Sequence, residues 1–385
     1  MKIRGLPLTS LAKLINSKRL LTDESPRSVF ICIADHYEPD WGKATEWLRA
    51  KRVERWLDEY PKSVDGIEDC RGRNPQHTFF YPLEEYRSNL LDKLASLCHA
   101  GFGDVEVHLH HHNDNSNSLH DKLIWFKNTL YDNHNLLRKD QSGDIRYGFI
   151  HGNWALCNSR ADGKWCGVND EINVLLKTGC YADFTMPSAP DPTQTRSINR
   201  IYYAFSDASQ PKSHDWGPAA RVGCNPPDNG LLMIPGPLSL DFKKRKWNLL
   251  PRIENGDLHA DRPPSIERLD LWENAEVSVE GKSDWIFCKL HTHGAKEENA
   301  AHLLGESMRR FHEALAIKAK QNSQFKYFYV TAYEMAELVH AAEAGCTEPD
   351  EILNQLENKS NPGSTLLHNL KSKTIHAERV NSLNR

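Results

Sequence analysis

The length and charge of the chain bound what the protein can be. It has 385 residues and a formal net charge of -4, with Lys+Arg 48 against Asp+Glu 52. That length fits one α/β barrel with insertions, and the clearest basic run is only the four residues 243–246, so we expect no nucleic-acid partner. Because no run of about eighteen apolar residues occurs and the amino terminus lacks a leader pattern, we expect no transmembrane segment and a cytoplasmic location.

The cysteine pattern argues against covalent cross-linking. Nine cysteines are scattered singly along the chain, and none forms a Cys-x-x-Cys pair. This spacing predicts reduced thiols in the core, in place of a disulfide framework or a structural zinc cluster.

Strands and helices are expected to alternate through the first half of the chain. The run 28–34 is continuously apolar and β-branched, as is typical of a strand covered on both faces. Alternation of this kind predicts a parallel sheet. The further strands are expected at 77–82, in the first part of 104–114, and at 147–154 and 180–187, with helices at 44–60, 83–100, 119–137 and 169–177.

The alternation is interrupted by a long segment, 188–264, which is rich in Pro, Gly, Asn and Asp. It contains only two short strand-like pieces, and such a segment inside a domain is typical of a lid or binding loop. The pattern then resumes with a strand at 285–294, a helix at 298–320, a strand at 325–330 and a helix capped by Thr331. We therefore expect an amino-terminal segment (1–27), a barrel domain (28–345) with the insertion 188–264, and a polar tail (346–385).

Histidines are concentrated in the segment from Asp104 to Asp114, where four of the chain's 19 histidines fall within five positions. In an extended chain, alternate side chains share a face, so His108, His110 and His112 would point to one side and Leu109 and His111 to the other. If the chain turned after the strand, residues four positions apart, either His110 and Asp114 or His108 and His112, could instead bind one ion together. Imidazole and carboxylate groups suit zinc and similar ions, although a polar loop with exposed histidines is the alternative. The candidate ligands here are His108, His110, His112 and Asp114.

Polar residues also follow the other predicted strands. If the strands are parallel and close into a barrel, their carboxyl ends open onto one mouth, where a bound ion would support metal-assisted hydrolysis. Asp35 and His36 would then join the metal ligands, while Asp35, His291 and His293 would transfer protons. The candidate substrate-binding residues are His77, His151, Asn153, Trp154 and Asp183.

Each of these residues also has a purely structural interpretation. Asp35 could cap the turn that follows its strand, and His36 or His77 could be hydrogen-bonded structural histidines. His151 could shape a turn, and Asp183 could be an internal hydrogen-bond acceptor. The pair His291 and His293 favours function more strongly, because alternate residues of a strand face the same way.

The order of these strand ends resembles that of polysaccharide deacetylases of the NodB-homology type, over roughly 28–345. In that family, an Asp-Asp pair ends the first strand, where this chain has Ala34, Asp35 and His36. A His-x-x-x-His motif ends the third strand, where this chain has the segment 108–114. The family's Arg-Pro segment corresponds to 147–154, and its late Leu-x-His segment corresponds to 289–293.

This resemblance implies a distorted (β/α)7-type barrel with a long insertion between the fifth and sixth strands, and a divalent ion, zinc by preference. The implied activity is removal of an acyl group from a carbohydrate or sugar-containing precursor in bacterial polysaccharide biosynthesis. Two alternatives stay open. A glycoside hydrolase or amidohydrolase would use a second carboxylate, Glu38 or Asp183. A barrel without catalysis, binding saccharide in an assembly, is favoured by the single aspartate at the first strand end.

Overall fold

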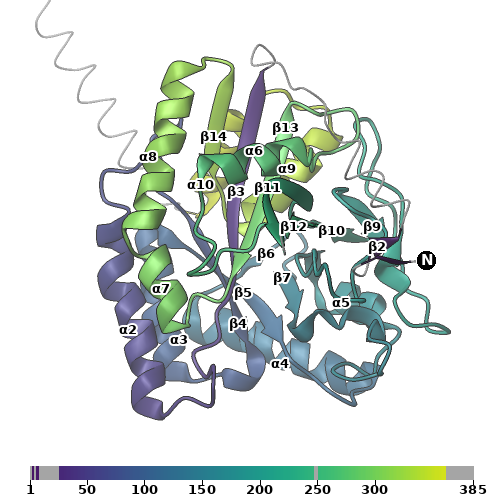
Figure 1. The fold of residues 1–385 in the computed structure, drawn as a ribbon. Helices are drawn as coiled ribbons and strands as arrows, with labels where there is room; N and C mark the ends of the chain where they lie inside the picture. The colour runs from purple at the N-terminus through teal and green to yellow at the C-terminus, as the bar shows by residue number, and fades with distance from the viewer. Residues whose placement is uncertain (1, 4–5, 8–25, 247–249, 361–385) are drawn as a thin grey trace, which may run out of the picture.

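The central feature of the computed structural model is a ten-stranded, mostly parallel sheet covered by helices (Figure 1). The structure describes residues 2–3, 6–7, 26–246 and 250–360. The predicted amino-terminal segment and the end of the polar tail therefore lie largely outside the described residues. The mixed α/β class is confirmed.

The strands of this sheet follow the order β13-β3-β4-β5-β7-β8-β10-β9, with β14 paired to β3 and β6 to β7. All pairs are parallel except β9 with β10 and β6 with β7. The carboxyl ends of the parallel strands consequently meet at one edge. The strands are β3 (Arg27–His36), β4 (His77–Pro82), β5 (Gly103–Leu109), β6 (Arg138–Lys139), β7 (Ile145–His151), β8 (Cys180–Asp183), β9 (Tyr202–Ala204), β10 (Leu231–Met233), β13 (Trp285–Thr292) and β14 (Phe325–Tyr329).

Helices α2, α3, α4 and α5 pack side by side on the outer face of the sheet, where α8 covers β14, while α9 packs on β3 from the opposite face (Figure 1). None of the described helices is long and apolar enough to cross a bilayer. The predicted helix 298–320 is divided into α7 and α8, because Gly305 begins a new helix as its N-cap. The helices are α2 (Glu46–Ser63), α3 (Ser88–Leu97), α4 (Ser116–His134), α5 (Glu171–Thr178), α6 (Ile266–Asn274), α7 (Glu297–Leu303), α8 (Glu306–Gln321), α9 (Ala332–Glu343) and α10 (Pro349–Ser360).

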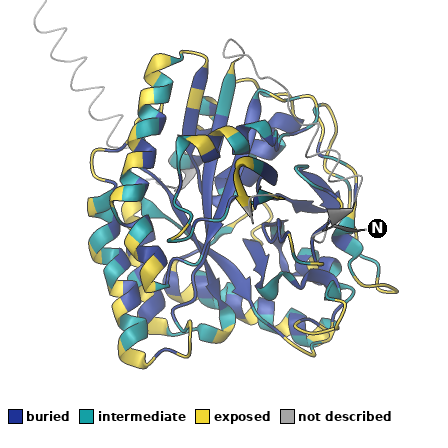
Figure 2. Ribbon diagram, viewed as in Figure 1, coloured by how far each residue is buried: buried dark blue, intermediate teal, exposed yellow. Residues whose placement is uncertain are grey.

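Strand β3, which is coloured as buried over most of its length in Figure 2, separates two apolar cores. Its odd-numbered residues, such as Ile31, pack under the outer helices with Trp56, and its even-numbered residues, such as Phe30, face an inner core. That inner core joins Phe287 of β13, near one end of the sheet, to Leu232 of β10, near the other. Lys289 of β13 also donates through Nζ to the carbonyl oxygen of Phe184, directly after β8, at 2.7 Å, so the sheet is strongly curved.

Closure into a (β/α)7 barrel is not confirmed, since no ladder of the described strands joins β10 or β9 to β13. The insertion 188–264 nevertheless contributes to the sheet, because β10 pairs with β8. Its residues 256–258 also lie along the end of β13: His291 N donates to Gly256 O at 3.0 Å, and Leu258 N donates to His291 O at 2.8 Å. Within the insertion, β11 (Ser239–Lys246) and β12 (Leu250–Glu254) form a separate hairpin, and β1 (Lys2–Ile3) pairs with β2 (Leu6–Pro7).

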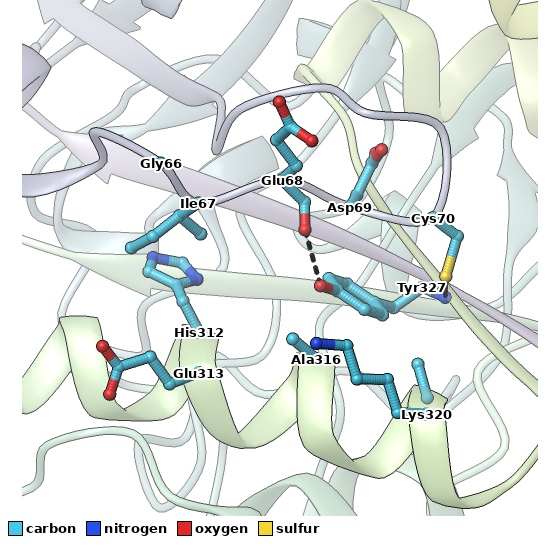
Figure 3. Close-up of a pocket in the computed structure, with 11 residues that line it drawn as sticks. Gly66, Ile67, Glu68, Asp69, Cys70, His312, Glu313, Ala316, Lys320 and Tyr327 are labelled. Atoms are coloured by element: carbon cyan, nitrogen blue, oxygen red, sulfur yellow. Dashed lines mark hydrogen bonds between the residues drawn. The ribbon is translucent and has the colours of Figure 1, made fainter.

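The outer edge of β14 is covered by a loop instead of a strand. Tyr329 N donates to Asp69 Oδ2 at 3.0 Å, and Tyr327 N donates to Cys70 Sγ at 3.4 Å. Figure 3 shows this loop above α8, with the Tyr327 hydroxyl donating to the Glu68 carbonyl oxygen at 2.7 Å. A surface pocket of about 410 Å³ lies between the loop, α8 and β14, and its lining residues do not include the strand-end histidines.

We expect the loss of Trp56 to destabilise the fold strongly. Its side chain is fully buried, and its Nε1 donates to the Gly294 carbonyl oxygen at 3.0 Å. Trp56→Ala should lower the free energy of unfolding by about 3–5 kcal/mol, measured by denaturant titration. Trp47→Ala on the same helix is the control: Trp47 is 68% exposed, and its loss should cost less than about 1 kcal/mol. Similar losses for the two variants would contradict the described packing.

Candidate metal centre

Three side chains at the carboxyl edge of the sheet form a group that can hold a metal ion. Glu38 follows β3, His108 lies in β5, and His110 follows β5 directly; one ligand atom from each lies within 4.8 Å of the others. Nε2 of His110 is 3.0 Å from Glu38 Oε1, and Nε2 of His108 is 3.7 Å from the same oxygen. A carboxylate and two imidazoles are a ligand set that zinc and its neighbours accept.

The hydrogen bonding of His108 leaves one ring nitrogen for an ion. Nδ1 lies 2.8 Å from the Ile150 carbonyl oxygen, which can only accept, so Nδ1 carries the hydrogen. Nε2 then presents a lone pair towards Glu38 and has no hydrogen-bond partner among the described residues, although it is buried. A backbone carbonyl that fixes the tautomer in this way is typical of a metal-binding histidine.

His110 lies between two carboxylates. Its Nδ1 is 2.5 Å from Glu84 Oε1, and its backbone N–H donates to the same oxygen at 3.1 Å. Burial opposes a charge on the ring, but the contacts with Glu38 and Glu84 raise the pKa of His110 to about 10. The backbone of Gly152 packs on the other side of the ring, where a Cβ would lie 2.2 Å from His110 Cδ2. A divalent ion would take the place of the proton between His110 and Glu38.

Three further histidines surround the cluster. Nδ1 of His293 lies 2.8 Å from Glu38 Oε2. The His36 ring centroid is 5.0 Å from that of His108 and 4.9 Å from that of His293. Burial is the main reason that the pKa of His36 is well below its usual value and that the pKa of His291 falls to about 3. Both rings are therefore neutral at neutral pH.

The insertion adds a carboxylate–histidine pair beside these rings. Asp257 Oδ2 lies 2.7 Å from His259 Nε2, and Asp257 Oδ1 lies 3.8 Å from His291 Nε2. The hydrogen bond to Asp257 raises the pKa of His259, whose ring is parallel to that of His293 at a centroid distance of 6.4 Å. Burial opposes the charge on Asp257, but contact with His259 lowers the pKa of this carboxyl group to about 2. The pair therefore holds its proton on the histidine.

Asp35 lies outside this cluster. Its Oδ1 accepts the Gly294 N–H at 2.6 Å, and its Oδ2 lies 2.9 Å from His77 Nε2. The carboxylate is fully buried, and a Cβ at Gly294 would lie 2.1 Å from Asp35 Oδ2, so this close approach requires glycine. Asp35 and His77 consequently join the end of β3 to the turn after β13.

The other two predicted ligands also point elsewhere. His112 accepts the Trp165 N–H through Nδ1 at 2.9 Å, in an exposed loop. Asp114 Oδ2 lies 2.7 Å from Lys122 Nζ and 3.1 Å from His111 Nδ1. Of the predicted ligands, the structure therefore brings together His108 and His110, with His36 beside them.

The predicted substrate-binding residues are not gathered at this cluster. Asp183 is buried, and both of its carboxylate oxygens accept hydrogen bonds from Thr185. His151 is buried, with Nε2 3.5 Å from Glu171 Oε1. Asn153 and Trp154 are half-buried in the turn that follows β7.

Glu84, Asp257 and His259 are not predicted as site residues from the sequence, and Glu38 is predicted only as a glycosidase carboxylate. Glu38 carries a recognisable signal, because it follows a buried strand by two positions. The other three lie in a turn and in the long insertion, where the sequence has no periodic pattern that places their side chains.

We expect metal binding to depend on Glu38 and His108, and not on Asp35. Glu38→Gln and His108→Ala should each lose about one divalent ion per chain, measured by elemental analysis of protein purified without chelator. Asp35→Asn is the control, because an amide can still accept from Gly294 N, and it should retain that ion. If Asp35→Asn were the variant that lost the ion, while Glu38→Gln and His108→Ala kept it, the metal site would have to lie at Asp35, at the end of β3.

Comparison with known proteins does not supply a family. No family model matches the sequence, and no curated protein matches it significantly. The resemblance to polysaccharide deacetylases therefore rests on the order of the strand ends.

Proposed function

We propose that the protein is a metal-dependent hydrolase that removes an acyl group from a carbohydrate. The observation that carries the proposal is the three-residue group Glu38, His108 and His110, which would hold a metal ion through three protein ligands. Sites with three protein ligands are typical of catalytic zinc, whereas structural zinc is held by four. The group is accessible from outside, since the His110 side chain is 29% exposed.

A divalent ion in this cluster would lower the pKa of a bound water molecule and polarise the acyl carbonyl group. Overall, water adds to the carbonyl carbon and the acyl–nitrogen or acyl–oxygen bond breaks. The acyl group leaves as a carboxylate, and the sugar amine or hydroxyl group receives a proton.

The proton transfers are assigned to His293 and to the pair Asp257–His259. His293 uses Nδ1 for its contact with Glu38, so its other ring nitrogen is left for water or substrate. The contact with Asp257 raises the pKa of His259, which favours the protonated, donating form of the ring, and the side chain is about one third exposed. Asp35 is less suited to act as a base, because both of its oxygens are occupied and it is fully buried.

The carbohydrate substrate is inferred from the resemblance and from one exposed aromatic side chain. Trp41 is 43% exposed, and its ring centroid lies 5.4 Å from that of His293. An indole at the edge of a hydrolytic site is suited to pack against a sugar ring. The curved sheet is consistent with the distorted (β/α)7 barrel that the resemblance implies. We further propose that the substrate is a sugar-containing precursor made in the cytoplasm.

The glycoside hydrolase alternative is less well supported. It needs two carboxylates that are free to act on the glycosidic bond. Glu38 is surrounded by histidines, and Asp183 is buried against Thr185.

Acetate release tests the proposal directly. The full chain, loaded with zinc, is incubated with N-acetylated and O-acetylated sugars, and acetate and new reducing ends are measured separately. Acetate should appear, should be lost on chelation, and should return on addition of zinc; Glu38→Gln should be inactive. Reducing ends without acetate would indicate a glycoside hydrolase, and neither product would leave a saccharide-binding protein.

We expect Trp41 to contribute to substrate binding and not to the chemical step. Trp41→Ala should raise KM about fivefold, equivalent to about 1 kcal/mol of lost packing, with kcat and metal content nearly unchanged. Trp125→Ala is the control, because Trp125 lies on α4 and is similarly exposed, at 49%. A fall in kcat without a change in KM would argue against a stacking role.

A further inference from the structure

A second group of potential ligands lies on the opposite side of the histidine-rich segment. It comprises His111, His151, Cys166 and Glu171, and one ligand atom from each lies within 4.8 Å of the others. All four residues are buried. They come from four separate places in the chain: the loop after β5, the end of β7, the loop 152–170 and the first residue of α5.

The hydrogen bonding of His151 leaves a lone pair aimed into this group. Its Nδ1 lies 2.6 Å from the Gly152 carbonyl oxygen, which fixes the hydrogen on Nδ1. Nε2 is then an acceptor 3.5 Å from Glu171 Oε1, and none of the described residues offers it a hydrogen bond. Two buried acceptors that face each other repel, and a cation between them removes the conflict.

His111 also lies between two carboxylates. Its Nε2 lies 3.2 Å from Glu171 Oε1 and is hydrogen-bonded to it, whereas its Nδ1 lies 3.1 Å from Asp114 Oδ2 without hydrogen-bond geometry. A cation bound at Nε2 would replace the hydrogen bond to Glu171. The single hydrogen of the neutral ring would then lie on Nδ1, facing the Asp114 carboxylate, an arrangement that is common for zinc-binding histidines. Asp114 is itself held by Lys122 and Ser118.

Cys166 supplies a sulfur ligand in a suitable environment. Its Sγ accepts the backbone N–H groups of Asn158 at 3.3 Å and Val168 at 3.4 Å, and lies 3.4 Å from Glu171 Oε2. Burial and the neighbouring Glu171 carboxylate raise the pKa of the Cys166 thiol well above its usual value, and the two backbone N–H groups only partly oppose this, so the thiolate that binds metal would form together with a bound cation. The second carboxylate oxygen of Glu171 also accepts the Cys157 N–H at 2.6 Å, so the backbone fixes this carboxylate as well.

We propose that His111, His151, Cys166 and Glu171 bind a structural zinc ion. Four protein ligands fill a tetrahedral shell, and two imidazoles, a thiolate and a carboxylate are all groups that zinc accepts. The site is closed, in contrast to the open group at Glu38. It does not rest on the proposed hydrolase activity.

The zinc ion would anchor the loop 152–170, which connects β7 to α5 through two short 3-10 turns. Its effect reaches the first centre through Gly152, which follows His151 and packs against the His110 ring. His110 and His111 are adjacent, so one segment supplies ligands to both centres.

Metal content and cobalt spectroscopy of the full chain test the proposal. Wild-type protein purified without chelator should contain about two divalent ions per chain, and Cys166→Ser should lose one of them. His108→Ala should lose the other ion. Cys157→Ser is the matched control, because it removes a neighbouring buried thiol whose sulfur is not among the ligand atoms, and it should retain both ions.

Cobalt replaces zinc without abolishing tetrahedral thiolate coordination, so its spectrum reports on the sulfur ligand. Cobalt-loaded wild type and His108→Ala should show a thiolate-to-cobalt charge-transfer band, and Cys166→Ser should lack it. Absence of that band in cobalt-loaded wild type would overturn the proposal even if Cys166→Ser fails to fold, as would an unchanged metal content in Cys166→Ser. Loss of an ion only in His108→Ala would leave the hydrolase proposal standing alone. Loss of an ion only in Cys166→Ser would support the structural zinc site and contradict the metal centre at Glu38, His108 and His110.

Discussion

Strand alternation at the end of β5 is the constraint on which both candidate centres depend. The strand is held between β4 and β7, so its residues must point alternately to the two sides of the sheet. His108, within the strand, and His110, directly after it, reach Glu38, while His111, also beyond the end of the strand, continues the alternation and reaches Glu171 on the other side. A shift of one residue in the strand pairing would exchange these faces and dismantle both groups at once.

The carboxylates at these centres are buried with histidines as their partners. Glu38 is surrounded by His108, His110 and His293, and Glu171 by His111 and His151. A lysine or arginine partner would neutralise a buried carboxylate permanently, whereas a neutral imidazole can give up its place to a cation. Histidine partners therefore leave both carboxylates able to bind a cation, whereas lysine or arginine partners would only stabilise the fold.

Much of the fold follows from local patterns in the sequence. The apolar run at 28–34 and the capping box at Thr331 both lie in the expected elements, because such signals depend on neighbours in the chain. The alternation of histidines likewise placed His108 and His110 on one face. Asp257 and Cys166 could not be found in this way, since they lie in irregular segments and each also meets a partner far away in the sequence, His291 for Asp257 and His111 for Cys166. Searching for Cys-x-x-Cys pairs also misses a mixed ligand group that contains a single cysteine.

The loop over β14 has a consequence for how copies of the chain meet. An uncovered strand edge offers a row of backbone donors and acceptors to which a strand of another molecule can add. Here Asp69 and Cys70 occupy the donors of Tyr329 and Tyr327 with side-chain atoms. Side chains occupy such an edge without extending the sheet, so growth of the sheet from one molecule to the next is blocked at β14. Protection of this edge against β-type aggregation thus depends on one short surface loop, residues 68–73.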